Sequence, residues 1–268
     1  MPLVLGVDSS TQSTKAEVRD ADTGELVGRG RAPHPQTAPP RSEQNAQDWW
    51  TALGVARDQA GHDDAVVAAS VAAQQHGMVV LDAADGVIRP AKLWNDTESA
   101  PDALWLISQL EGGAAAWAEA CGSVPVAAFT ITKLSWLHRM EPDAFARVAR
   151  VMLPHDWLAW RLTGELGTDR GDASGTGYFS AATNRYRLDL LGLVDPELDW
   201  EAALPPVLGP ADAFGTGDNM AAALALGLRA GDAVISLGTS GTVFASSAVP
   251  TADPTGAVAG FADATGGF

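Results

Sequence analysis

The sequence predicts an α/β fold, and three observations lead to that prediction. Short apolar runs rich in β-forming residues, such as Leu3 to Val7 and Val66 to Val71, indicate buried strands. Longer stretches with helical periodicity, such as Thr130 to Met140, indicate amphipathic helices. The strands come first and mixed strand–helix units follow, an order that is typical of α/β domains.

We expect the chain to open as a β-meander. The first run ends at Asp8, and a hydroxyl-rich turn leads into the alternating segment from Lys15 to Arg19. A turn at residues 20–24 then leads to a third strand at Leu26 to Arg31. Asn45 is placed to cap the first helix, because apolar residues at helical spacing follow it.

The remaining expected elements alternate along the chain. The strands are Val66–Val71, Met78–Leu81, Ala91–Trp94, Ala233–Leu237 and Thr242–Ser246, and the helices are Glu98–Leu110, Ala114–Ala120, Thr130–Met140, Pro142–Ala149, Asp156–Leu162 and Asn219–Leu228. Five tryptophans at helical spacings are expected in the core: Trp49, Trp50, Trp136, Trp157 and Trp160.

The composition is that of an ordinary globular chain of 268 residues, 46% apolar and 19% charged. The net charge of −16 argues against a nucleic-acid binder, which needs basic patches for phosphate contacts. The single cysteine, Cys121, excludes an internal disulfide and a cysteine-based metal cluster, favours a cytoplasmic location, and is expected to be a small buried thiol. No apolar stretch approaches the length of about 18 residues that crosses a membrane.

Two turns could bind phosphate. The first follows Asp8, whose carboxylate could reach a Mg²⁺ ion directly or through water while the hydroxyls of the turn face phosphate oxygens. The second is Gly238-Thr239-Ser240-Gly241, between two apolar strands. Taken alone, each turn is better explained as a plain hairpin turn. No P-loop sequence occurs anywhere in the chain.

Asp218 is the candidate general base. Flexible glycines present it just before an alanine-rich helix, and there it could accept a proton from a substrate hydroxyl. The helix dipole is expected to keep this carboxylate ionised. The alternative is an ordinary N-cap, a position at which Asp is favoured.

Two further motifs follow expected strands and could bind a sugar. Gln74-Gln75-His76-Gly77 would lie at the carboxyl end of a parallel strand, where ligands of α/β sheets bind. Trp94-Asn95-Asp96 combines an aromatic face with an amide and a carboxylate, which suits a polyol. The alternatives are a buried histidine satisfied by the backbone and a core tryptophan followed by a turn.

These motifs, in this order, resemble the FGGY family of carbohydrate kinases over essentially the whole chain. The resemblance is carried by Gly6-Val7-Asp8-Ser9-Ser10-Thr11, Ser42-Glu43-Gln44 with Trp49-Trp50, Gln74-Gln75-His76-Gly77, Leu93-Trp94-Asn95-Asp96, Phe129-Thr130-Ile131-Thr132-Lys133-Leu134, Leu153-Pro154-His155-Asp156, Asp172-Ala173-Ser174-Gly175-Thr176, Gly217-Asp218-Asn219 and Ser236-Leu237-Gly238-Thr239-Ser240-Gly241.

The resemblance implies a ribonuclease H-like, actin-type fold with two lobes and a cleft between them. Residues 1–232 would form the sugar-binding and base-bearing domain, and residues 233–268 would begin the ATP-binding domain. The implied reaction is ATP-dependent phosphorylation of a ketopentose, with D-xylulose favoured by the Gln75-His76 and Trp94-Asn95-Asp96 elements. The alternatives are a family member acting on ribulose, gluconate or glycerol, and a non-catalytic sugar-binding domain.

The resemblance also implies roles for individual residues. Asp218 would be the general base, and Asp8 would orient Mg²⁺–ATP. The sugar would contact Gln75, His76, Trp94, Asn95, Asp96 and Asn219, and the phosphates would contact Thr11, Gln12, Ser13, Gly238, Thr239 and Ser240.

The chain departs from the family pattern at three places. Ser10 stands where the first loop usually has glycine. The interval before Gly215 is too short for the strand and helix that the family has there, so about 20 residues are expected to be missing. Chains of the family run to nearly twice this length, so this chain is expected to be truncated after the first domain, without the adenosine-binding part of the second lobe. The residues leave open whether the alanine-rich helix packs within one chain or in a homodimer.

Overall fold

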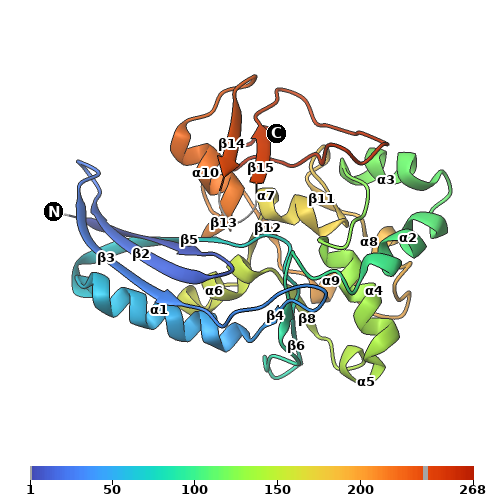
Figure 1. The fold of residues 1–268 in the computed structure, drawn as a ribbon, viewed down its shortest axis with the longest axis horizontal. Helices are drawn as coiled ribbons and strands as arrows, with labels where there is room; N and C mark the ends of the chain where they lie inside the picture. Colours follow the sequence, from blue (N-terminus) through green and yellow to red (C-terminus); the bar gives the residue numbers. More distant parts are fainter. Residues whose placement is uncertain (1, 238–240) are drawn as a thin grey trace.

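A five-stranded sheet, built mainly from the opening strands, forms the centre of one half of the molecule (Figure 1). The structure is a computed structural model that describes residues 2–237 and 241–268. Its strands are β1 (Leu3–Ser9), β2 (Ser13–Asp20), β3 (Leu26–Pro33), β5 (Val66–Ala73) and β13 (Gly215–Gly217), in the order β13-β5-β1-β2-β3. The first three strands are antiparallel, whereas β5 is parallel to both β1 and β13. The carboxyl ends of β1, β5 and β13 therefore point in one direction.

Helix α1 (Ala46–Ala60) packs against β2 and β3. It begins where the sequence predicts, because the Asn45 side chain accepts a hydrogen bond from the backbone N–H of Gln47. Its buried face includes Trp49 and Leu53, which join the alternate inward side chains of β1 in one hydrophobic core. Alternate residues of the strand and residues three or four apart on the helix each form one apolar face, and these two faces pack together in that core.

A second core lies among the helices in the other half of the molecule. It is built around Trp117, Leu134 and Trp200, all of them buried. The elements around it are β6 (Val79–Leu81), α2 (Ala100–Gln109), α3 (Gly113–Cys121), α4 (Thr130–Met140), α5 (Pro142–Phe145), β8 (Arg150–Met152), α8 (Leu188–Leu191) and α9 (Trp200–Ala203).

Short elements complete the chain. They are β4 (Glu43–Gln44), η1 (Asp63–Ala65), β7 (Ala91–Lys92), α6 (Pro154–Thr163), β9 (Thr168–Asp169), α7 (Arg170–Ala173), η2 (Ser174–Thr176), β10 (Phe179–Ser180), β11 (Arg185–Tyr186), β12 (Val207–Leu208), α10 (Asp218–Leu226), β14 (Ala233–Leu237) and β15 (Gly241–Ala245).

Most expected elements are confirmed, with one clear exception. The helix predicted over residues 142–149 ends at Phe145. The reason is tertiary: the backbone N–H of Ala149 donates to the carbonyl of Leu81, which draws the chain into strand β8 beside β6. The predicted phosphate turn at residues 238–240 lies outside the described residues.

The short interval before Gly215 is crossed by a single turn. Strand β12 ends at Leu208, the N–H of Asp212 donates to the carbonyl of Gly209, and the carbonyl of Phe214 accepts from the N–H of Val71. Strand β13 then pairs with only the last three residues of β5. The first part of β5 lies open, and Val67 is 69% exposed.

The final segment returns over the helical half of the molecule (Figure 1). The N–H of Gly260 donates to the carbonyl of Gly122, and the N–H of Ala262 donates to the hydroxyl of Ser174. Strands β14 and β15 form a separate hairpin. Over residues 2–237 and 241–268, no helix combines the length and the apolar character needed to cross a bilayer.

Candidate active site

A cleft of about 1420 Å³ opens beside the carboxyl end of β5 and the start of α10. Segments far apart in the sequence form its walls. They include Ser10, Thr11 and Gln12 from the first turn, Gln75 and His76, Trp94 and Asn95, Ala128 and Phe129, Asp218, Asn219 and Met220, and residues 257–265 of the final segment. The structure thus brings together most of the predicted site residues.

Gln75 and Asn219 form the floor of the candidate sugar site. The Oε1 atom of Gln75 accepts a hydrogen bond of 2.7 Å from Nδ2 of Asn219. Its Nε2 atom lies 3.0 Å from the sulfur of Met220. A Cβ atom at position 217 would lie 2.5 Å from Nε2 of Gln75, so this approach requires Gly217. The two predicted ligand-binding motifs are therefore held together directly.

His76 is held by aromatic and charged neighbours. Its ring lies between those of Phe129 and Phe261, with centroid distances of 5.6 Å and 5.3 Å. Its backbone has a φ of 58°, in the left-handed region that histidine seldom adopts. Its N–H donates to the buried carboxylate of Asp172 at 3.3 Å. Strained backbone of this kind is often found at ligand sites.

Trp94 and Thr11 join the two sides of the cleft. The indole N–H of Trp94 donates to the hydroxyl of Thr11 at 2.9 Å, and that hydroxyl donates to Oε1 of Gln74 at 3.1 Å. Trp94 keeps 37% of its surface exposed and can offer an aromatic face to a ligand. The neighbouring Oδ1 of Asn95 is buried without a hydrogen-bond partner within the protein.

Asp218 lies in the cleft as predicted, but two details differ. Gly217 takes the N-cap position, and Asp218 is the first residue of α10. The pKa of Asp218 is raised to about 6, chiefly by burial and further by the negative charge of Asp172. Desolvation therefore outweighs the helix terminus in setting this pKa, but a carboxyl group with a pKa of about 6 is still mostly ionised at pH 7.

Asp8 does not line the cleft itself. Its carboxylate forms an ion pair of 2.7 Å with Nζ of Lys15 and remains 42% exposed. An accessible carboxylate is the kind of donor that Mg²⁺ uses together with phosphate oxygens and water. The residue is therefore compatible with a Mg²⁺–nucleotide complex.

The first turn is only partly directed at the cleft. Ser10 fits without a positive φ, and its hydroxyl donates to the carbonyl of Ser13, so serine in place of glycine causes no strain. Gln12 lines the cleft with Thr11. Ser13 does not, because its buried hydroxyl accepts a hydrogen bond from Nε of Arg31. The hydroxyl of Ser13 is therefore not directed into the cleft, where the sequence predicts that it contacts phosphate.

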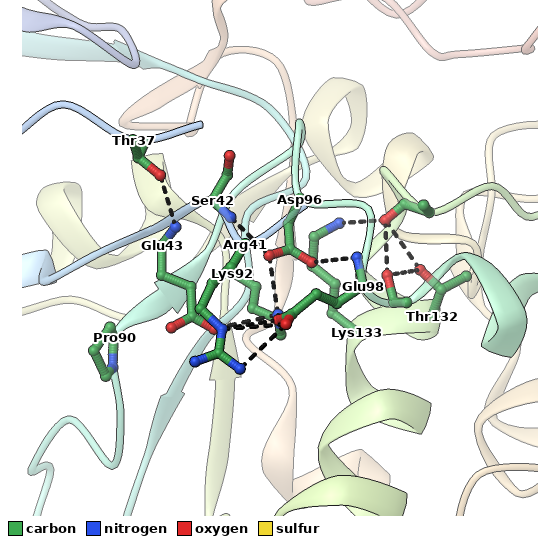
Figure 2. A network of polar contacts seen from close by, with 12 residues as sticks. Thr37, Arg41, Ser42, Glu43, Pro90, Lys92, Asp96, Glu98, Thr132 and Lys133 are labelled. Carbon is green, nitrogen blue, oxygen red and sulfur yellow. Dashed lines mark hydrogen bonds and ion pairs between the residues drawn. The ribbon is translucent and has the colours of Figure 1, made fainter. Parts of the chain in front are cut away.

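Asp96 also lies away from the cleft, in a network of polar contacts (Figure 2). Its Oδ2 atom accepts from the N–H of Ser42 at 2.9 Å and from Nζ of Lys92 at 3.0 Å. Lys92 also contacts Glu43 and Glu98, so its ammonium occupies the space among three carboxylates. Asp96 therefore holds the Trp94-Asn95 turn in place and does not take the predicted position against the sugar.

Several residues at the site have no assigned role in the sequence analysis. Phe129 and Phe261 frame His76, and the Lys133 ammonium binds the carbonyls of Ala127, Ala128 and Phe129 beside the cleft. Burial lowers the pKa of Lys133 to about 7. Their sequence signal is weak, since a phenylalanine or a helical lysine is usually structural.

Cys121 is confirmed as a buried thiol, and burial raises its pKa to about 12. A thiol with so high a pKa is a poor nucleophile at neutral pH.

The five tryptophans expected in the core are found there. Trp49, Trp136 and Trp157 are buried, and Trp50 and Trp160 pack against the first core.

Comparison with known proteins agrees with the geometry. The N-terminal domain of the FGGY family of carbohydrate kinases matches residues 3–246, a range that extends past the predicted domain end at residue 232. Xylulose kinase from Streptomyces coelicolor is 52% identical over 287 aligned positions, which cover 99% of this chain and 58% of that protein. Xylulose kinase from Streptomyces rubiginosus is 50% identical with the same coverage.

The chain therefore spans a little more than half of the length of these relatives. The 287 aligned positions exceed the 268 residues of the chain, so the Streptomyces coelicolor protein contains residues that this chain lacks.

Solved structures share the fold. Xylulose kinase from Bifidobacterium adolescentis has a TM-score of 0.92 at 44% identity, over 99% of this chain and 63% of its own. Gluconate kinase from Lactobacillus acidophilus has a TM-score of 0.82 at 21% identity, over 95% and 56%, a likeness that shows the fold alone. The ribonuclease H-like, actin-type fold is thereby confirmed. With the family match covering most of its residues, this chain belongs to the FGGY family of carbohydrate kinases.

Proposed function

We propose that this chain is the sugar-binding and base-bearing part of an ATP-dependent kinase that converts D-xylulose to D-xylulose 5-phosphate. The observation that carries the proposal is that one cleft holds Asp218 together with Gln75, His76 and Trp94. Relatives that match almost the whole chain are named xylulose kinases, which supports the choice of sugar.

The sugar side of the cleft has the groups that recognise a polyol. Gln75, Asn95 and Asn219 offer amide donors and acceptors, and His76 adds a ring nitrogen. Trp94 offers a flat apolar face for the C–H groups of the sugar. Since the orientation of Gln75 is fixed by Asn219 and Met220, the donors are positioned before the ligand arrives.

Asp218 is suited to take the proton of the attacking sugar hydroxyl. With a pKa of about 6 it is mostly ionised at pH 7, yet it is more basic than an exposed aspartate. The hydroxyl oxygen would form a bond to the γ-phosphorus of ATP as its proton passes to Asp218, while the bond from that phosphorus to the β–γ bridging oxygen breaks and ADP leaves. Phosphoryl transfer needs positioning and charge neutralisation rather than a covalent nucleophile.

The nucleotide would approach from the side of Asp8. Bound Mg²⁺ would neutralise charge on the ATP phosphates, and Asp8 is the residue that would hold it. Thr11 and Gln12 line the cleft on this side, and the turn Gly238-Thr239-Ser240 is assigned to phosphate binding by family resemblance. The division into a domain at residues 1–232 and the start of a second at 233–268 belongs to the same proposal.

The test is ADP formation with Mg²⁺–ATP and a panel of D-xylulose, D-ribulose, gluconate and glycerol, with sugar binding measured in parallel by calorimetry. Asp218→Asn is expected to lower kcat by about 10²- to 10⁴-fold while the sugar still binds. The matched control is Asp48→Asn, which changes an acidic residue in the first turn of α1, away from the cleft.

The outcomes separate the candidates. D-Xylulose turnover that depends on Asp218 supports the proposal, and preference for another sugar changes the substrate. D-Xylulose binding without ADP formation indicates a non-catalytic sugar-binding domain. Failure to bind any of the sugars contradicts the assignment of the cleft.

A further inference from the structure

A buried histidine outside the cleft makes contacts that lead to both halves of the candidate active site. His155 lies near the start of α6 and is almost completely buried. Its Nδ1 atom is 2.8 Å from Oδ2 of Asp172. Its Nε2 atom is 3.0 Å from Oδ1 of Asp156 and 3.4 Å from Oδ1 of Asp169. Three buried carboxylates thus surround one imidazole.

The first arm runs from His155 through Asp172 to His76. While Oδ2 of Asp172 contacts His155, its Oδ1 accepts the N–H of His76 at 3.3 Å and lies 3.5 Å from Nδ1 of that ring. Asp172 has no exposed surface. A carboxylate bridging two histidines in this way can fix both the strained backbone and the ring of His76.

The second arm runs from His155 through Asp169 to the strand that precedes Asp218. The Oδ2 atom of Asp169 accepts a hydrogen bond of 2.6 Å from the hydroxyl of Thr216 on β13. Asp218 follows Thr216 by two residues and begins α10. The hydrogen bond therefore fixes the strand end from which the base projects into the cleft.

The charges of the cluster support a cationic His155. Burial alone would lower the pKa of His155, but the carboxylates of Asp156, Asp172 and Asp169 raise it to about 10. Burial would raise the pKa of Asp172, but the two histidines lower it to about 2. An imidazolium between carboxylates can hold both arms at once, since both of its ring nitrogens are donors.

The geometry points to His155 as a positioning residue that sets the sugar subsite at His76 and the base at Asp218 through one buried ionic cluster. This inference rests on the proposed function for the roles of His76 and Asp218. The cluster itself is independent of that function. Nothing in the contacts requires His155 to touch substrate.

The test uses two conservative variants of this chain, each with a matched control. Asp172→Asn removes the charge of the first arm, and its control Asp102→Asn changes another buried carboxylate, which binds Ser135 and Arg139 away from the cleft. Thr216→Val removes the hydroxyl of the second arm. Its control Ser135→Ala also removes a hydroxyl that donates to a buried carboxylate.

The readouts are calorimetric binding of D-xylulose and NMR spectra of the histidine rings and backbone amides. Asp172→Asn is expected to shift the ring signals of His76 and to weaken D-xylulose binding about 10- to 100-fold, the range for losing a hydrogen bond to a charged group. Thr216→Val is expected to shift the amide signals of Asp218 and Asn219 while leaving the ring of His76 unchanged. Both controls are expected to leave these signals and the affinity unchanged.

The inference is overturned if folded Asp172→Asn keeps the His76 ring signals and the affinity of the unmodified chain, or if the controls produce the same changes. If Asp172→Asn does not fold, Thr216→Val decides: unshifted Asp218 and Asn219 amides overturn the second arm. If the unmodified chain does not bind D-xylulose, the proposed function fails, while the NMR signals still decide whether the cluster positions these residues.

Discussion

Replacing Lys92 with methionine should strongly destabilise the fold. The Lys92 side chain is fully buried, and its Nζ atom lies 3.0 Å from Asp96, 2.6 Å from Glu98 and 3.2 Å from Glu43. The same atom lies 3.8 Å from the centre of the Trp136 ring. Methionine keeps the apolar stem but removes the ammonium group that lies among the three carboxylates (Figure 2).

The size of the effect follows from the exposure of each partner. Glu43 and Glu98 are 16% and 21% exposed and also contact arginines, so losing their contacts with Lys92 contributes little to the loss in unfolding free energy. Asp96 has no exposed side-chain surface, and Lys92 is its one cationic partner among the residues that the structure describes. Breaking a buried ion pair by removing one partner costs about 3–5 kcal/mol, so we expect a loss in that range.

Urea unfolding of Lys92→Met at pH 7 measures this loss. Arg41→Met is the control, because Arg41 contacts Glu98 but is 64% exposed, and its removal should cost less than about 1 kcal/mol. A loss below about 1 kcal/mol for Lys92→Met, or a loss equal to that of Arg41→Met, would refute the reasoning.

Three further predictions follow from burial and packing. Folding raises the pKa of His155 from 6.5 to about 10, so its stabilising contribution is complete below pH 6.5 and is lost as the pH rises towards 10. The free energy of unfolding measured across this pH range should therefore decrease. In His155→Gln the decrease should be smaller. In Gly175→Ala, the new Cβ would lie 1.8 Å from the His76 ring, so the ring must move, and calorimetry should show weaker D-xylulose binding; unchanged affinity would contradict the placement of His76. Cys121, with its pKa raised to about 12, should resist iodoacetamide until the chain is unfolded, as mass spectrometry can show; rapid labelling of the native chain would contradict its burial.

Local pattern was enough to predict the elements that carry the cleft. The strand that contains Asp8, the strand before Gln74 and the helix after Gly217 each have a clear period in the sequence. Because carboxyl ends of neighbouring parallel strands meet at one edge, placing Gln75 and His76 at the edge that lines the cleft needed no tertiary information. The joining of these motifs into one site came from the family resemblance.

The direction of individual side chains could not be predicted in the same way. Ser13 and Asp96 lie beside cleft residues in the sequence, yet both side chains are buried, and they bond to Arg31 and Lys92 instead of facing the cleft. The raised pKa of Asp218 depends on burial by distant segments and on the charge of Asp172, which no local pattern reveals. Tertiary partners therefore decide which polar residue of a motif faces the ligand.

The most direct test of the account is an NMR titration of the isotope-labelled chain with D-xylulose. The account predicts saturable shifts at the indole N–H of Trp94, the ring of His76 and the amides of Asp218 and Asn219, with smaller effects from glycerol. An absence of saturable shifts, or shifts confined to residues outside the cleft, would contradict the assignment of this cleft as the sugar site.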